Sequence, residues 1–238
     1  MRQAPEHVLE LNILEGRQDK RIDDLLSLVA TIGIRPLTVS RATLDNLVDG
    51  ATHQGVVARV RPRAAMQEDD LEALLDRLEE PPLLLILDGV QDPHNLGACL
   101  RSADATGTHA VIVPRNRAAT LNATVRKVSC GASETVPFVQ VTNLARTLRA
   151  LGAQGIRRVG ADEDAEQDLF GADLSGPLAL VMGSEGRGLR RLTREHCDLL
   201  IRLPMQGAVE SLNVSVATGV CLYFARAGRH HAGTAPLA

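Results

Sequence analysis

Short apolar segments alternate with helical segments from residue 83 onward, and this alternation restricts the possible folds more than any other feature of the sequence. The segment LLLILD at 83–88 is apolar up to its last residue, which is typical of a parallel strand buried on both faces. Further strands are predicted at 109–114, 135–141, 156–162, 178–183 and 198–204, with helices at 93–106, 121–130, 143–153, 188–197 and 211–227. This order predicts an α/β domain with a mostly parallel sheet covered by helices on both faces.

The first 60 residues have a pattern of their own, which predicts a small separate α/β unit. Two helical segments end at Gly33 and Gly50, and each precedes a segment with strand character. The stretch 63–82 has turn and charge character and contains an amphipathic helix that Pro81 and Pro82 end. We therefore divide the chain into a small α/β domain at 1–62, a linker with a helix at 63–82, a larger domain at 83–228 and a flexible tail at 229–238.

The composition excludes several classes of protein. No apolar run approaches the roughly 20 residues of a membrane span, and the N-terminus lacks an apolar signal core, so we expect a cytoplasmic protein. The four cysteines form no C-x-x-C pair, which argues against a zinc ribbon and a redox motif. Aromatic residues are 2% of the chain and the net charge is −3, so a base-stacking platform and a uniformly basic RNA binder are both excluded. Any RNA contact must use local patches of arginine.

The first segment with candidate site residues is LDGVQDPHNLGACLRSADATG at 87–107. Asp92 and Pro93 suit the cap and first position of a helix, which explains them structurally. Asn95 follows at the carboxyl end of a strand, where open α/β sheets bind ligands. Arg101 lies six residues further on, about 120° around the helix. From its position alone, a surface arginine is the simpler interpretation of Arg101.

The second segment, LALVMGSEGRGLRR at 178–191, contains a strand that runs into a glycine-rich loop. Gly183, Gly186 and Gly188 allow close approach of the backbone to a ligand, and Glu185 lies among them. The spacing is neither the dinucleotide-binding motif nor a phosphate-binding P-loop. The arginines that follow form either a phosphate-facing patch or a solvated helix face: Arg187, Arg190, Arg191 and Arg194.

The third segment, LLIRLPMQGAVESLNVSVATGV at 199–220, leads from a strand through a loop into the last helix. Ser211 is a candidate N-cap for this helix. Because Ser211 and Asn213 are two residues apart, they cannot share a helix face. At least one of them is therefore expected in the loop, near the other two segments.

Together, DPHNLGACLRSADATG, LVMGSEGRGL and IRLPMQGAVESLNVSVA resemble the three motifs of the SpoU (TrmH) family of SPOUT methyltransferases, in order and at the family's spacing. The likeness is strongest to members that methylate a guanosine 2′-hydroxyl in 23S ribosomal RNA. The N-terminal stretches ILEGRQDKR and DGATHQGVVARV also resemble the small RNA-binding domain of those members. Since a further strand and helix usually precede the segment that matches EHVLELNILEG, we expect this domain to be truncated here.

The resemblance implies a fold and a set of partners. It implies a deep trefoil knot in the C-terminal SPOUT domain, which binds S-adenosylmethionine, and a homodimer with the final helix in its interface. It also implies large-subunit ribosomal RNA as the substrate, without a metal or a membrane. The cofactor-binding residues carried over are Met182, Gly183, Gly186, Ile201, Leu203, Met205 and Leu212.

The implied reaction is attack of a ribose 2′-oxygen on the methyl group of the cofactor. By resemblance, Arg101 activates the hydroxyl. Since a guanidinium keeps its proton, the alternative is an electrostatic role, in which Arg101 stabilises the developing alkoxide and binds the neighbouring phosphate. Asn95 would orient the ribose or phosphate, and Glu185 would anchor an arginine or a polar group of the loop. Ser211 and Asn213 would supply hydrogen bonds that shape the site and hold Arg101. His94 is the second candidate base.

Two other functions stay open at this point. The first is 2′-O-methylation of transfer RNA, in which case residues 1–60 would not select the substrate. The second is a protein that binds RNA or the ribosome without catalysis and retains the knot. The presence of all five polar site residues argues against the second, because a binding protein has no evident need for them.

Overall fold

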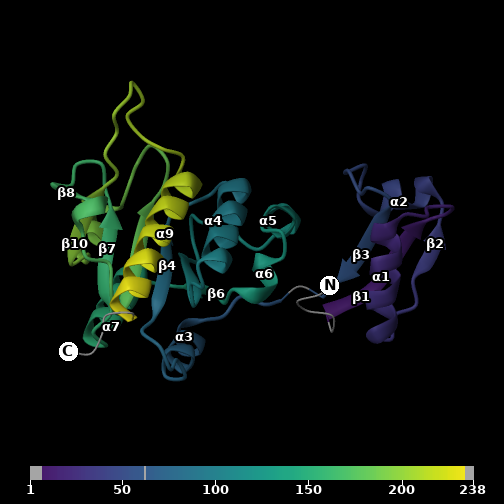
Figure 1. Cartoon of the computed structure of the whole chain (residues 1–238), viewed down its shortest axis with the longest axis horizontal. Helices are drawn as coiled ribbons and strands as arrows, with labels where there is room; N and C mark the ends of the chain where they lie inside the picture. Colours follow the sequence, from purple (N-terminus) through teal and green to yellow (C-terminus); the bar gives the residue numbers. More distant parts are fainter. Residues whose placement is uncertain (1–6, 62, 234–238) are drawn as a thin grey trace. The chain divides into compact units, whose positions relative to one another are not determined.

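The computed structural model describes residues 7–61 and 63–233, and the chain divides into two units, Met1–Ala64 and Ala65–Ala238. Figure 1 shows the elements of each unit, which are described separately below. Within the described residues, no helix is long and apolar enough to cross a membrane.

The first unit is a three-stranded sheet with two helices. Its elements are β1 (Val8–Leu14), α1 (Lys20–Thr31), β2 (Leu37–Val39), α2 (Arg41–Leu47) and β3 (Val56–Val60). The central strand β1 pairs with β2 in parallel and with β3 in antiparallel orientation. Leu11 and Ile13 of β1 pack against Ile22 and Val29 of α1, and these four buried side chains form the core. The small α/β unit predicted for this region is confirmed, with β1 as a strand that the pattern did not predict.

The second unit is built on seven parallel strands in the order β6-β5-β4-β9-β7-β10-β8. The strands are β4 (Leu83–Asp88), β5 (Ala110–Pro114), β6 (Phe138–Val141), β7 (Arg157–Ala161), β8 (Gln167–Asp168), β9 (Leu178–Gly183) and β10 (Leu199–Arg202). The helices are α3 (Glu68–Leu75), α4 (Pro93–Ala105), α5 (Ala123–Val128), α6 (Ala132–Thr135), α7 (Leu144–Ala153), α8 (Arg191–Glu195) and α9 (Val214–Gly233), with a short 3₁₀ turn at Leu169–Gly171.

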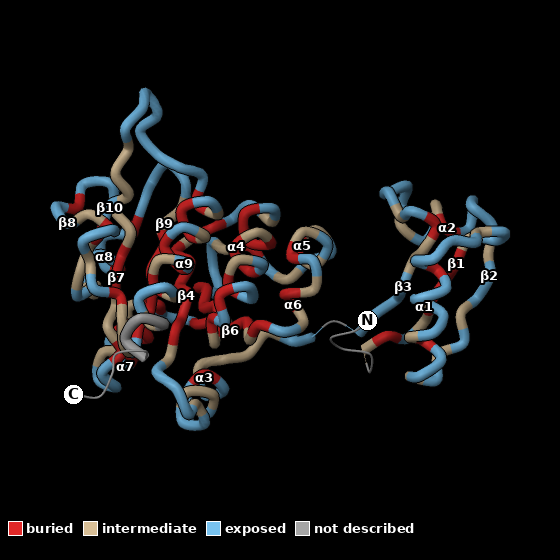
Figure 2. Tube along the Cα trace, in the orientation of Figure 1, coloured by how far each residue is buried: buried red, intermediate tan, exposed pale blue. Residues whose placement is uncertain are grey.

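Helices cover both faces of this sheet, as the uninterrupted apolar strands predict. Side chains alternate along β4, so Leu85 faces one core and Ile86 the other. The first core is closed by α4 and α9, and the second by α3 and α7. Figure 2 shows the buried strands at the centre of the unit, with exposed backbone at its periphery. The α/β class with a parallel sheet is thereby confirmed, while the knot stays a prediction.

Two segments differ from the sequence-based division. Residues of the expected linker belong to the second unit, because Met66 bridges to Val139 of β6 and Leu71 of α3 is buried in the core. Residues 229–233, expected in a flexible tail, belong to α9. The rest of that expected tail lies outside the described residues.

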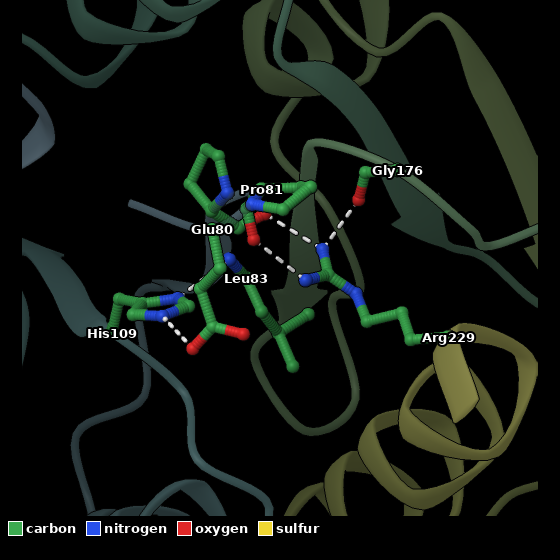
Figure 3. Close-up of polar contacts among 7 residues, drawn as sticks. Glu80, Pro81, Leu83, His109, Gly176 and Arg229 are labelled. Carbon is green, nitrogen blue, oxygen red and sulfur yellow. Dashed lines mark hydrogen bonds and ion pairs between the residues drawn. The ribbon is translucent and has the colours of Figure 1, made fainter. Parts of the chain in front are cut away.

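Arg229 explains why α9 continues beyond residue 228. Its guanidinium donates hydrogen bonds to the carbonyl oxygens of Pro81 and Pro82, both at 2.7 Å, and to that of Gly176 (Figure 3). These carbonyls precede β4 and β9, so the contact holds the end of α9 against the amino ends of two central strands. Partial burial lowers the pKa of Arg229 from its usual value.

Replacing Arg229 with alanine should lower the free energy of unfolding by about 2 kcal/mol, since hydrogen bonds to a charged group contribute about 1.5–3 kcal/mol and the carbonyl oxygens would lose their donor. Urea denaturation measures this change. Arg226→Ala is the matched control, because Arg226 lies one turn earlier on α9 and, among the residues that the structure describes, no comparable set of backbone contacts holds it. Equal losses for the two variants would contradict the anchoring role of Arg229.

Candidate functional site

The loops that follow β4, β5, β7 and β9 surround two adjoining cavities at the carboxyl edge of the large sheet. The larger cavity has a volume of about 460 Å³ and the smaller one about 360 Å³. Ser184, Glu185, Arg187 and Val214 line both of them. This is the edge at which open α/β sheets bind ligands, and both volumes lie in the range of ligand sites.

The glycine-rich loop forms part of the wall of the larger cavity. Ser184 and Gly188 exchange two backbone hydrogen bonds, of 3.1 and 2.9 Å, which close the loop into a tight turn. Gly186 and Gly188 have positive φ angles of 73° and 61°. A Cβ atom on Gly183 would lie 2.2 Å from the carbonyl carbon of Gly188, so only glycine fits there.

An ion pair with a buried carboxylate connects this loop to β4. Asp88, whose side chain is fully buried, accepts a hydrogen bond from the backbone N–H of Arg190 at 3.0 Å and pairs with the guanidinium of Arg190. Arg190 immediately precedes α8 and follows the glycine loop. The carboxylate at the end of β4 therefore sets the exit of the loop, and the sequence analysis did not single out Asp88.

Asn213 joins the three sequence motifs at one point. Its Oδ1 accepts a hydrogen bond from the backbone N–H of Ser215 at 2.9 Å, so its Nδ2 group points away from the first turn of α9. That Nδ2 donates to Asn95 Oδ1 at 2.9 Å and to Glu185 Oε1 at 2.5 Å. Asn213 thus caps α9 in place of the candidate Ser211 and holds Asn95 and Glu185 together.

The structure places most of the other predicted residues at the larger cavity. Ser211 lines it, although no hydrogen bond of its side chain is found among the described residues. The predicted cofactor-binding residues that line it are Met182, Gly183, Gly186, Leu203, Met205 and Leu212. Ile201 does not, because its side chain is fully buried in the core of the sheet.

Arg101 lies outside both cavities of the single chain. It is exposed on α4, and its Nη1 is 3.8 Å from the sulfur of Cys130. His94, the second candidate base, is also exposed and lines neither cavity. The structure therefore assembles Asn95, Glu185 and Asn213 within one chain, but not Arg101.

Thiol and metal chemistry find little support at this edge. Burial raises the pKa of the Cys99 thiol to about 11, and that of Cys221 to about 12, so both stay protonated at neutral pH. Among residues 7–61 and 63–233, no cluster of three or more His, Cys, Asp or Glu side chains could hold a metal ion.

Acidic residues after β7 are the main part of the larger cavity that sequence reasoning missed. Asp162, Glu163 and Asp164 line it, together with Glu210. Asp162 is nearly buried and pairs with Arg194 of α8 at 3.4 Å. Their position directly after a parallel strand is the signal that could have identified them, since the adjacent strand β9 ends at the glycine loop.

Comparison with known proteins agrees with this geometry. Residues 82–223 match the SpoU rRNA Methylase family, and residues 1–66 match the family described as RNA 2′-O ribose methyltransferase substrate binding. The chain is 57% identical over 219 residues, 92% of its length and 89% of the relative's, to the 23S rRNA (guanosine-2′-O-)-methyltransferase RlmB of Photorhabdus laumondii. It is 56% identical to RlmB of Escherichia coli K12, over 94% of this chain and 91% of the relative.

Solved structures show the same fold. The SpoU methyltransferase AviRb from Streptomyces viridochromogenes, in complex with AdoMet, superposes with a TM-score of 0.78 at 29% identity and covers 97% of this chain and 87% of its own. The A. aeolicus TrmH/SpoU tRNA modifying enzyme superposes with a TM-score of 0.60 at 30% identity, over 70% of this chain and 85% of its own. With three motifs converging on one cavity edge and a match over most of the chain, this protein belongs to the SpoU rRNA methylase family.

Proposed function

We propose that this protein is an S-adenosylmethionine-dependent enzyme that methylates the ribose 2′-oxygen of a guanosine in 23S ribosomal RNA in the cytoplasm. The observation that carries the proposal is the 57% identity to an RlmB methyltransferase across nearly the whole of both chains. In this proposal the domain at 1–62 binds the RNA and the domain at 83–228 holds the catalytic site.

The larger cavity suits S-adenosylmethionine. The glycine loop that begins at Gly183 forms part of its wall, and Met182, Leu203 and Leu212 offer apolar contacts for an adenine ring. Carboxylates along the rim complement the positive charges of a sulfonium and an ammonium group. The bound cofactor supplies an electrophilic methyl group.

The cluster formed by Asn95, Glu185 and Asn213 would then position the ribose. Asn95 and Glu185 are held by one amide group, so Glu185 Oε2 is free to accept a hydrogen bond from the 2′-hydroxyl. Ser211 on the wall of the larger cavity would add a further hydrogen bond. Arg101 would stabilise the alkoxide that develops on the 2′-oxygen, and its place outside both cavities suggests that a second protomer brings it to the site.

A homodimer is part of the proposal, and the surface of α9 supports it. Val216, Val220 and Tyr223 follow helical spacing and are 51%, 37% and 58% exposed. An exposed apolar stripe of this kind is typical of an interface. The same helix begins at Val214, directly after Asn213, which would place the interface beside the site.

Val220→Arg should convert the dimer to a monomer, because it buries an unpaired charge in the proposed interface. Light scattering coupled to size-exclusion chromatography measures the mass. Leu192→Arg is the control, since Leu192 is also an exposed apolar residue but lies on α8. A dimer that survives Val220→Arg would contradict this interface.

Methyl transfer from labelled S-adenosylmethionine tests the function. Unmodified 23S rRNA and bulk transfer RNA are offered in parallel, and the modified nucleotide is mapped. We expect label at one guanosine ribose of 23S rRNA. Label in transfer RNA alone would show that transfer RNA, and not 23S rRNA, is the substrate. Cofactor binding without methyl transfer to either RNA would favour the non-catalytic alternative.

A further inference from the structure

Two arginines of the smaller cavity are free of acidic partners. Arg117 and Arg187 both line it, and neither forms an ion pair within the described residues. Arg190, the third arginine there, is neutralised by Asp88. The smaller cavity therefore offers two guanidinium groups that no ion pair engages, beside the cluster of Asn95 and Glu185.

The backbone holds Arg117 at the rim of this cavity. Ala119 donates a hydrogen bond from its N–H to the carbonyl oxygen of Val90 at 2.8 Å, which joins the loops after β5 and β4. Gln91 Nε2 lies 3.5 Å from the carbonyl oxygen of Arg117. Arg117 itself has a φ of +60°, a left-handed conformation that is unfavourable for a non-glycine residue. Such strain persists where surrounding contacts enforce it, which is common at ligand sites.

Asp92 and Glu185 also line the smaller cavity, but their carboxylates accept hydrogen bonds from neutral groups and form an ion pair with neither arginine within the described residues. Asp92 accepts a hydrogen bond from the backbone N–H of His94 at 2.9 Å. Glu185 accepts one from Asn213. A bidentate, planar cation with no carboxylate partner suits a phosphate oxygen pair.

We propose that the smaller cavity binds an RNA phosphodiester adjacent to the target ribose, and that Arg117 is a phosphate-binding residue that positions this ribose. The inference rests on the proposed function and extends it to a defined subsite. Arg117 lines only the smaller cavity, whereas Arg187 lines both. A substitution of Arg117 should therefore change RNA binding without changing cofactor binding, so the test uses this residue.

The experiment compares Arg117→Ala with Arg115→Ala in the full-length protein. Arg115 lies in the same loop, donates to Gln67 Oε1 at 3.3 Å and lines neither cavity, so it is a matched control for loss of one charge. Arg117→Asn is the second variant, because asparagine tolerates the left-handed conformation and keeps the loop intact. Binding of an unmodified 23S rRNA transcript is measured at several salt concentrations, and S-adenosylmethionine binding by calorimetry.

Both Arg117 variants should bind the transcript about tenfold more weakly or worse, and the slope of log K against log salt should become shallower by about 1. Their affinity for S-adenosylmethionine should stay within about twofold of wild type, since Arg117 does not line the larger cavity. RNA binding by the Arg117 variants that equals that of Arg115→Ala would overturn the inference. So would a loss of cofactor affinity as large as the loss of RNA affinity.

The inference and the proposed function fail in different ways. If the wild type binds the transcript but transfers no methyl group, the proposed function is wrong, while the comparison of the Arg117 and Arg115 variants still decides the subsite. If the wild type methylates the transcript and the Arg117 variants keep wild-type RNA affinity and salt slope, the subsite alone is wrong.

Discussion

Gly183→Ala is expected to abolish cofactor binding and to lower the free energy of unfolding by about 1–3 kcal/mol, the range for overpacking a tight site. The added Cβ would lie within 2.5 Å of backbone atoms of both Gly188 and Leu189. Backbone atoms cannot rotate away as a flexible side chain can, so the whole turn must move. Calorimetric titration with S-adenosylmethionine and thermal unfolding measure the two effects.

Gly207→Ala is the control for this change. No atom lies within 4 Å of the Cβ position at Gly207, and its φ is not positive, so both measurements should stay near wild type. If Gly183→Ala binds the cofactor as tightly as Gly207→Ala does, the glycine loop is not the wall of the cofactor site.

Arg101→Ala should reduce methyl transfer by about 10²–10³-fold, the effect of removing one donor that stabilises a developing oxyanion. Cofactor binding should stay near normal, because Arg101 lies outside the larger cavity. Single-turnover transfer at saturating RNA and cofactor separates this effect from weakened binding. Turnover close to wild type would remove Arg101 from the mechanism.

Mixed dimers test whether Arg101 acts across the interface. Two inactive variants, Arg101→Ala and Glu185→Ala, are co-expressed with different tags, and the heterodimer is purified. If Arg101 of one protomer completes the site around Glu185 of its partner, one of the two sites is intact and about half of the wild-type activity returns. If both residues act within one chain, the heterodimer stays inactive.

The strands that the sequence predicts best are those buried on both faces. The predicted bounds of β4 and β9 agree with the structure, because a continuous apolar segment can be recognised without knowing which strands lie beside it. Strand β1 was missed since its register shifts between Val8 and Glu10, which breaks the alternation that identifies a half-buried strand. The linker helix was assigned to no domain because its apolar stripe does not show which surface buries it.

The polar site could be predicted only in part. The sequence motifs contain Asn95, Glu185 and Asn213, but only the folded structure shows that these three side chains contact one another. Ser211 was the candidate cap of α9, but Asn213 caps it in the structure, and the same side chain contacts Glu185, 28 residues away in sequence. Asp88 was missed because the sequence does not show that its carboxylate is buried against Arg190, whereas the position of Asp162 directly after a parallel strand is a signal that could have identified it.

The contact between Asn213 and Asn95 spans 118 residues of sequence, and it has a consequence for biosynthesis. Chains fold as they emerge from the ribosome, N-terminal parts first, and closure of so long a loop is entropically costly until the intervening strands have paired. Asn213 is translated after all the described strands. Arg229 secures the other end of α9 and follows Asn213 by sixteen residues. A chain that ends before Asn213 therefore contains every described strand of the sheet but lacks the side chain that joins Asn95 to Glu185.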